Sequence, residues 1–315
     1  MSEPGSPDRP VTDAPPSAPL TTLLGVLDLA EAHVDRARPG DDATFEGASL
    51  HQPTGRVYGG QVLAQSLLAA GRTVEPDRLP HSLHGYFLRA GDVTESITFG
   101  VEQLRDGRSF SARRTHAYQS GAPILSMITS FQKTQLGIDY ADSPPQVPPP
   151  DEVASALDAL GAIDHPMAAF WSTQSAFDIR HVEGSIYLGA EAARQHTQLV
   201  WMRSRGRVDG GRTGDEQLLH RALLAYACDQ IMLEPVLRGS GNSWSTPGLS
   251  LASLDHAMWW HRDVRVDEWL LYAEESPSAQ GGRGLTTAKV FAQDGTLVAT
   301  IAQEGMVRVP EEIEA

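Results

Sequence analysis

The sequence contains a single cysteine, Cys228, among its 315 residues. One thiol cannot build an internal disulfide framework, and it cannot supply the several thiolates of a structural zinc site. Asp229 follows Cys228 directly, and a neighbouring carboxylate disfavours the thiolate form that a cysteine nucleophile needs. We therefore expect Cys228 to pack in the protein core rather than to take part in a reaction.

Positive charge is scarce as well. The chain has 25 lysines and arginines against 40 aspartates and glutamates, which gives a formal net charge of -15. This balance argues against a general nucleic-acid binder, because no basic surplus exists to neutralise phosphates. The sequence also lacks an apolar run of about 18 residues that would span a bilayer and a recognisable signal peptide. We expect a cytoplasmic protein with neither nucleic-acid nor membrane partners.

Motifs of several common enzyme classes are missing too. There is no Gly-x-Ser-x-Gly elbow of the α/β hydrolases. The glycine-rich stretch Gly239–Gly248 lacks the Gly-Lys-Ser/Thr of a phosphate-binding loop, so we predict a flexible loop there. The histidines His81 and His84 invite a metal, but a metal site needs three convergent ligands. We expect neither a metal nor an organic cofactor.

Two proline-rich segments divide the chain. Residues 1–20 contain six prolines among small and polar residues, which predicts a disordered tail. The segment "SPPQVPPP", Ser143–Pro150, can form neither a helix nor a central strand. We therefore predict an N-terminal unit over residues 21–135, a linker over 136–170 and a C-terminal unit over 171–315.

The two units repeat the same order of elements. Each contains an apolar helix, predicted over Gly60–Thr73 in the first unit and Leu218–Glu234 in the second. Runs of alternating pattern follow, with hairpin dipeptides at Asp106-Gly107, Ser120-Gly121 and Asp294-Gly295. A helix followed by a long antiparallel meander, occurring twice, indicates duplication. A curved sheet wrapped around each helix gives an α+β double hotdog as the predicted fold.

An aspartate stands near the centre of the second predicted helix. Asp229 shares a helix face with Tyr226 and Leu233, where a buried unpaired carboxylate is costly. One interpretation is a structural carboxylate that caps a neighbouring loop or pairs with an arginine. The first helix, Gly60–Thr73, contains no acid, so the fold itself does not require one. This asymmetry favours a chemical role for Asp229.

Six segments of the chain occur together in a familiar order. They are "GRVYGGQVLAQSLLAA", "HSLHGYFLRAGD", "DGRSFSARRTHAYQ", "YACD", "SLDHAMWWHR" and "AQEGMVR". From about Leu24 to Arg308 the chain thereby resembles the acyl-CoA thioesterase II family, double-hotdog enzymes that hydrolyse fatty acyl-CoA thioesters. No single segment is specific, but six in order are. The resemblance implies an acyl-CoA substrate and a homodimer or homotetramer.

The resemblance also implies a catalytic set in the second unit. The family's aspartate matches Asp229, and its glutamine matches Gln303. Its hydroxyl residue, two positions before Asp255, matches Ser253; many members have threonine there, and serine lacks the β-branch that restricts χ1. We expect Asp229 to activate a water without a covalent step, with the Ser253 hydroxyl and the Gln303 amide oxygen completing the water site. The oxyanion donors would be backbone N–H groups.

Two other functions fit a hotdog protein. A hotdog enoyl-CoA hydratase or dehydratase would need an Asp/His pair, but His220 lies nine positions before Asp229, too far along a helix to share its site. A non-catalytic acyl-CoA-binding regulator would be expected to carry a basic DNA-binding extension, which the sequence lacks. Arg113 or Arg114 could bind the phosphates of CoA, although only one of two neighbours on a strand faces inward.

Overall fold

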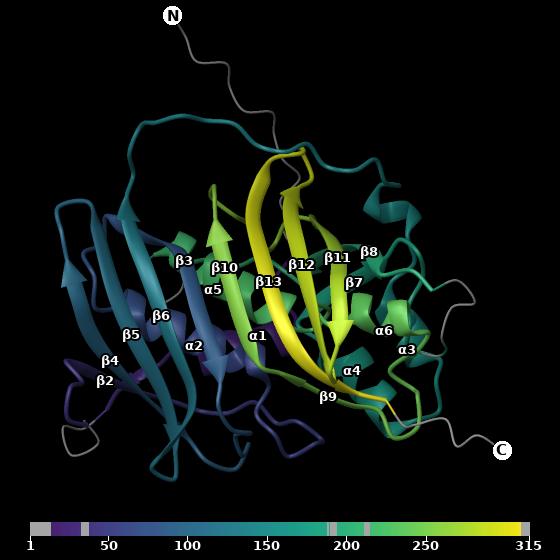
Figure 1. Ribbon diagram of the computed structural model, residues 1–315, viewed down its shortest axis with the longest axis horizontal. Coiled ribbons are helices and arrows are strands. Elements are labelled where there is room, and N and C mark those ends of the chain that lie inside the picture. Colours follow the sequence, from purple (N-terminus) through teal and green to yellow (C-terminus); the bar gives the residue numbers. More distant parts are fainter. Residues whose placement is uncertain (1–13, 33–37, 188, 190–193, 211–214, 310–315) are drawn as a thin grey trace, which may run out of the picture.

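The computed structural model describes residues 14–32, 38–187, 189, 194–210 and 215–309. Within these residues one antiparallel sheet of 13 strands runs across the whole molecule (Figure 1). The strands lie in the order β1-β2-β4-β5-β6-β3-β10-β13-β12-β11-β8-β7, and β9 pairs with β13 beside this row.

Both halves of the chain contribute strands and helices. The strands of the first half are β1 (Ala30–Glu31), β2 (Ala43–Gly47), β3 (Arg78–Phe87), β4 (Ile97–Asp106), β5 (Phe110–Gln119) and β6 (Ala122–Lys133). Those of the second half are β7 (Phe177–His181), β8 (Thr197–Ser204), β9 (Ser250–Ser253), β10 (Asp255–Trp260), β11 (Leu270–Gln280), β12 (Arg283–Ala292) and β13 (Leu297–Arg308). The helices are α1 (Ala18–Leu27), α2 (Gly59–Gly71), η2 (Pro150–Glu152), α3 (Ala156–Gly161), α4 (Pro166–Gln174), α5 (Glu216–Cys228) and α6 (Glu234–Ser240).

The strand order reads alike outward from the central pair. From β3 the row runs β6, β5, β4 and β2, and from β10 it runs β13, β12, β11 and β8. β3 and β10 pair antiparallel, with Gly85 opposite His256, so the curved sheet of one half continues into the other. With one long helix in each half, this arrangement is a double hotdog and confirms the predicted fold class.

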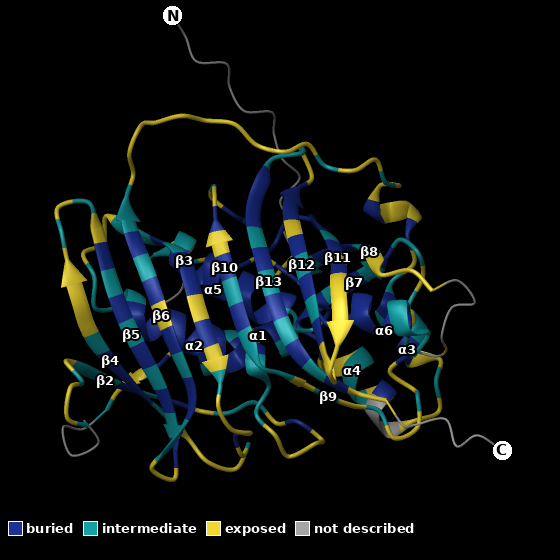
Figure 2. Cartoon of the chain, in the orientation of Figure 1, coloured by how far each residue is buried: buried dark blue, intermediate teal, exposed yellow. Residues whose placement is uncertain are grey.

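The two long helices lie behind the middle of the sheet in Figure 1. They pack antiparallel: Gly60 at the start of α2 lies against the carbonyl of Tyr226 near the end of α5, and Gly71 lies against Leu218 near its start. Glycine at these two places lets the helices approach closely. Figure 2 shows buried residues on both helices and alternating burial along the strands, the pattern expected when one sheet face covers a core.

The helix predicted over Leu218–Glu234 is wrong in its length. α5 ends at Cys228, Asp229 is its C-cap residue, and α6 begins at Glu234. Pro235 lies in the first turn of α6, where a missing N–H costs nothing; in a continuous helix its ring would clash with the preceding turn. Asp229 therefore lies just past a helix end, not inside a helix.

The N-terminal segment and the linker contain more regular structure than the sequence predicted. Residues 1–13 of the predicted tail lie outside the described residues, but α1 begins at Ala18, because the Ser17 hydroxyl caps its first turn. The predicted linker over 136–170 includes η2, α3 and the start of α4. Residues 134–149 have no regular structure and cross between the halves at the top of Figure 1. No helix in the described part of the chain is long and apolar enough to cross a membrane.

Candidate active site

Three polar side chains meet where the two halves join. Gln303 Nε2 lies 2.9 Å from Asp229 Oδ1 and 2.8 Å from Ser253 Oγ. The Ser253 hydroxyl donates to the same carboxylate oxygen at 3.1 Å. Asp229 caps α5, Ser253 ends β9, and Gln303 lies on the buried face of β13. The structure thus brings together all three residues that the resemblance singled out.

The first half contributes a backbone donor to this cluster. The Gly60 N–H, in the first turn of α2, donates to Asp229 Oδ2 at 2.8 Å. The C-terminal end of α5 carries a partial negative charge that disfavours a carboxylate, whereas the N-terminal end of α2 carries a partial positive charge that favours one. The Asp229 carboxylate is therefore held by donors from both halves of the molecule.

The start of α2 leaves no room for side chains. A Cβ on Gly59 would lie 2.8 Å from Asp229 Oδ2, and a Cβ on Gly60 would lie 2.4 Å from the Tyr226 carbonyl oxygen. The Tyr58 hydroxyl donates to that same carbonyl at 2.8 Å. The glycine pair of the "YGGQ" segment therefore has a steric reason, which the sequence alone did not reveal.

A buried histidine lies behind Gln303. His256 Nδ1 is 2.6 Å from Gln303 Oε1. Burial lowers the pKa of His256, although the nearby Asp229 carboxylate acts in the opposite direction. The ring is therefore neutral at neutral pH. This contact corrects an expectation: the amide oxygen of Gln303 faces His256 and does not complete a water site.

Cys228 has the inert environment that the sequence predicted. The thiol is fully buried, and burial together with the Asp229 carboxylate raises its pKa well above the ordinary value. Its Sγ lies 3.4 Å from the Ala225 carbonyl oxygen and 3.6 Å from His256 Nε2. A buried thiol with a raised pKa has little thiolate, so Cys228 is not a nucleophile.

A cavity of about 510 Å³ adjoins the end of α5. Its wall comes from α1, the loop before α2, α4 and the end of α5, and most of it is apolar. Leu23, Leu50 and Phe170 line its apolar part, while Tyr226 and Gln230 bring its wall next to Asp229.

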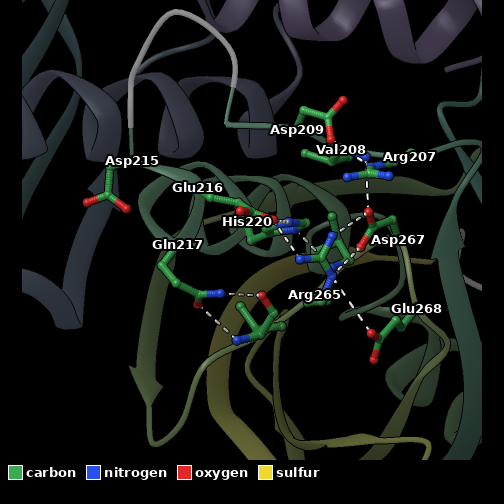
Figure 3. Close-up of polar contacts among 12 residues, drawn as sticks. Arg207, Val208, Asp209, Asp215, Glu216, Gln217, His220, Arg265, Asp267 and Glu268 are labelled. Carbon is green, nitrogen blue, oxygen red and sulfur yellow. Dashed lines mark hydrogen bonds and ion pairs between the residues drawn. The ribbon is translucent and has the colours of Figure 1, made fainter. Parts of the chain in front are cut away.

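An ion-pair cluster lies at the opposite end of the helix pair, near the start of α5 (Figure 3). There Arg265 forms ion pairs with Glu216, in the first turn of α5, and with Asp267. His220 is fully buried beside them, and its Nδ1 accepts a hydrogen bond from a backbone amide at 3.1 Å. Burial lowers the pKa of His220. His220 therefore belongs to an ion-pair cluster remote from Asp229, as the helix spacing predicted.

Arg113 is the inward-facing member of the Arg113–Arg114 pair. It is 1% exposed, and its guanidinium donates to Thr73 and Asp106, so it is not available to the phosphates of CoA. Arg114 pairs with Glu102 nearer the surface. Across the part of the chain that the structure describes, no three His, Cys, Asp or Glu side chains are grouped to hold a metal ion.

Two family models match the chain. The model described as acyl-CoA thioesterase N-terminal domain matches residues 48–132, and the one described as acyl-CoA thioesterase C-terminal domain matches residues 143–307. Their order agrees with the two halves of the sheet, although the first model begins after β2.

Similar proteins carry matching names. Acyl-coenzyme A thioesterase 8 of Homo sapiens is 36% identical over 289 residues, which cover 87% of this chain and 88% of that protein. Acyl-CoA thioesterase 2 of Haemophilus influenzae is 33% identical over 276 residues, which cover 86% of this chain and 94% of that protein. The crystal structure of acyl-CoA thioesterase II TesB2 from Mycobacterium marinum is 39% identical with a TM-score of 0.73, and the match covers 92% of this chain and 99% of that one.

Proposed function

The chain belongs to the acyl-CoA thioesterase II family, and from this we propose that it hydrolyses fatty acyl-CoA thioesters to free fatty acid and CoA at the Asp229 site. The observation that carries the assignment of the site is the meeting of a carboxylate, a hydroxyl and an amide from three separate elements within hydrogen-bonding distance. A thioester is activated enough for a positioned water and a carboxylate to suffice.

In the proposed step Asp229 is the general base. A water oxygen attacks the thioester carbonyl carbon while an oxygen of Asp229 takes its proton. The carbon–sulfur bond then breaks, and the CoA sulfur leaves with the proton returned from Asp229. The Ser253 hydroxyl donates to Asp229 and accepts from Gln303, so a lone pair is left to accept a hydrogen bond from the water.

The start of α2 is placed to stabilise the oxyanion. Negative charge develops on the carbonyl oxygen during attack, and backbone N–H groups at a helix N-terminus stabilise such charge. The Gly60 N–H already donates to Asp229 Oδ2, and protein atoms fill the space beside Gly59 and Gly60, so this helix would act on the oxyanion through the partial positive charge of its N-terminal end. The first half of the molecule would thereby contribute to the oxyanion stabilisation that the sequence left unassigned.

A covalent acyl-enzyme has less support. In the described part of the chain the Ser253 hydroxyl contacts Asp229 and Gln303 and no histidine, so the serine–histidine pair that usually activates a serine nucleophile is not formed. Cys228 is buried with a raised pKa. Both observations favour direct attack by water.

Thiol release from a series of acyl-CoA chain lengths tests the function and the site together. Asp229→Asn keeps the shape of the side chain but removes the base, and we expect kcat to fall by about 10²-fold or more. Ser253→Ala and Gln303→Ala should lose activity on a similar scale. Ser250→Ala, an exposed change on the same strand as Ser253, is the matched control and should leave kcat unchanged. Folded variants of the three site residues with wild-type rates would exclude the assignment.

The hydratase alternative is disfavoured because His256 is buried and both of its ring nitrogens contact other protein groups. A hydratase needs a histidine that can exchange a proton with its substrate, but both ring nitrogens of His256 face protein partners, and the residue is 1% exposed. With crotonyl-CoA as substrate, we expect thiol release with crotonate as the acid product and no 3-hydroxybutyryl product. Binding of acyl-CoA without turnover would instead support the non-catalytic alternative.

The cavity beside α5 is the proposed place of the acyl chain, because its wall is largely apolar and reaches Asp229 through Tyr226 and Gln230. Ala169 lines this cavity and is exposed, so a tryptophan there would fill space without entering the core. Ala169→Trp should shift the preferred substrate to shorter acyl chains in the same thiol-release series. Ala162→Trp, at an exposed position at the end of α3, should not. Equal chain-length profiles for the two variants would place the acyl chain elsewhere.

The proposed assembly is a homodimer or homotetramer, and the proposed location is the cytoplasm. Support for self-association comes from the outer face of the central strands, where Tyr86 is 62%, Ile128 46% and Trp259 36% exposed. Large apolar side chains gathered on one face are typical of surfaces that a partner covers.

A further inference from the structure

Gln303 and His256 are cross-strand neighbours on the inner face of the sheet. β10 and β13 pair antiparallel with Ala257 opposite Ala302, and this register places His256 opposite Gln303. His256 is 1% exposed and Gln303 is fully buried. Because water does not reach the pair, the hydrogen bond of 2.6 Å between Nδ1 and Oε1 is the interaction that sets their relative orientation.

Asp229 decides the direction of every hydrogen bond in this group. A carboxylate accepts hydrogen bonds, so Gln303 must turn its NH₂ toward Asp229 and Ser253. The amide oxygen then faces His256, and Nδ1 of the ring must carry the proton. Nε2 is left as an acceptor, and it faces the Cys228 thiol at 3.6 Å. With its proton on Nδ1 the ring donates to Gln303 Oε1, and the single thiol proton of Cys228 goes to either the Ala225 carbonyl oxygen or Nε2.

The first half of the molecule does without such a pair. At the corresponding place on β3 and β6, Leu83 lies opposite Thr129. His84 and Ala257 face each other where the halves join and are equivalent positions of the internal repeat, so Leu83 and His256, one residue before each, are equivalent too. Because the same sheet forms with leucine and threonine, the fold does not require the histidine–glutamine pair of the second half.

We propose that His256 is a positioning residue: its Nδ1–H donates to Gln303 Oε1 and thereby holds the Gln303 amide with its NH₂ against Asp229 and Ser253. Without this donor the Gln303 amide keeps only its contacts with Asp229 and Ser253, its buried oxygen has lost its partner, and the side chain shifts away from the geometry that the site needs. This inference rests on the proposed function, since it gives His256 a task within the same site.

Two replacements of similar volume test the proposal. Asparagine places an amide N–H where His256 has Nδ1, whereas leucine places a methyl group there. We expect His256→Leu to lower kcat about tenfold or more with KM changed less than about twofold, because a misplaced group costs rate rather than binding. His256→Asn should stay within about threefold of the wild type, because the donor to Gln303 is kept.

A second measurement does not depend on turnover. In ¹⁵N-histidine NMR of the wild type, His256 is expected in the tautomer with its proton on Nδ1, and its signals should move in Gln303→Leu. Equal loss of kcat in folded His256→Asn and His256→Leu, or a proton on Nε2, would overturn the proposal. Full activity of Asp229→Asn would refute the proposed function instead, while the tautomer would still decide the positioning role.

Discussion

At the scale of single residues, the problem is how a carboxylate is held at a helix end. Asp229 receives three donors: the Gly60 N–H, the Ser253 hydroxyl and the Gln303 amide. Hydrogen bonds to a charged group stabilise more than neutral ones and offset the desolvation of the carboxylate. Among the described residues Asp229 forms no ion pair with an arginine, but it does accept from the backbone N–H of Gly60, which is the capping role that the structural interpretation allowed.

Sequence reasoning predicted the polar side chains of this site but not the groups that hydrogen-bond to them. Asp229, Ser253 and Gln303 stand in segments that resemble family motifs, and the structure brings them together. Gly60 was missed as a donor because a backbone N–H has no side chain to indicate it. The partner of His256 was missed because cross-strand neighbours are separated by a long stretch of sequence, which no local pattern spans.

Gly59→Ala should lower kcat by about 10- to 100-fold, because its Cβ would lie 2.8 Å from Asp229 Oδ2 and small displacements of a reacting group are costly in rate. Thiol release at saturating acyl-CoA measures this effect, and thermal unfolding reports the fold. The control is Gly25→Ala in α1, where an added Cβ meets nothing within 4 Å. That change should leave kcat intact and stabilise the helix by about 0.5–1 kcal/mol. A Gly59→Ala enzyme with full kcat would contradict the steric argument.

At the scale of elements, a second buried network fixes α6 to the sheet. Glu234 at the start of α6 is within 2.7 Å of His181 Nε2 and accepts from Gln198 at 3.0 Å. Gln198 also donates to Glu274 on β11. Burial raises the pKa of Glu274 to about 8, and the Glu234 carboxylate acts in the same direction. Burial raises the pKa of Glu234, but its hydrogen-bond partners outweigh burial and the pKa is lowered overall. The contact with His181 contributes most to this lowering. Glu274 therefore keeps its proton at neutral pH.

This network predicts how stability depends on pH. The pKa of Glu274 is about 8 in the folded chain against 4.5 for the ordinary side chain. Between these values the folded chain holds a proton that the unfolded chain releases, so the contribution to stability is fully present below the lower pKa and is lost as pH rises through the higher one. Glu274→Gln is neutral at every pH and should gain about 3 kcal/mol relative to the wild type between about pH 6 and about pH 9.

Urea unfolding of both proteins at these two pH values provides the measurement. Glu275→Gln is the matched control, because Glu275 is the exposed neighbour on the same strand. Its difference from the wild type should be independent of pH. If the free energies of unfolding of Glu274→Gln and the wild type differ by the same amount at both pH values, Glu274 does not hold the extra proton.

At the scale of the whole molecule, the sequence predicted the repeat but not how its copies join. Two helix-and-meander units followed from apolar periodicity and turn dipeptides, which are local signals. β3 and β10 pair through backbone hydrogen bonds between segments far apart in sequence. No local residue pattern predicts such a pairing. The helical turns inside residues 136–170 were missed because prolines suggested an extended linker; Ser155, which caps α3, was the overlooked signal.

The outer face of the central strands makes a prediction about assembly. Trp259 packs edge-on against His84, with ring centroids 5.1 Å apart, on this exposed face. If a second copy covers the face, Trp259→Glu should reduce the mass in solution, measured by light scattering, because a charge would be buried in an apolar contact. Leu104→Glu, an equally exposed apolar position on β4, should keep the wild-type mass. A monomeric wild type would refute self-association.

The exposed crossing over residues 134–149 gives the molecule a practical use as a sensor. It ties together two halves that share one site, since Gly60 and Asp229 stand on opposite sides of it. Two fragments made separately, one from each side of this crossing, would have no complete site until β3 and β10 paired. Turnover by the mixed fragments would therefore report their meeting, and each assembled pair would amplify that signal with every thioester it hydrolysed.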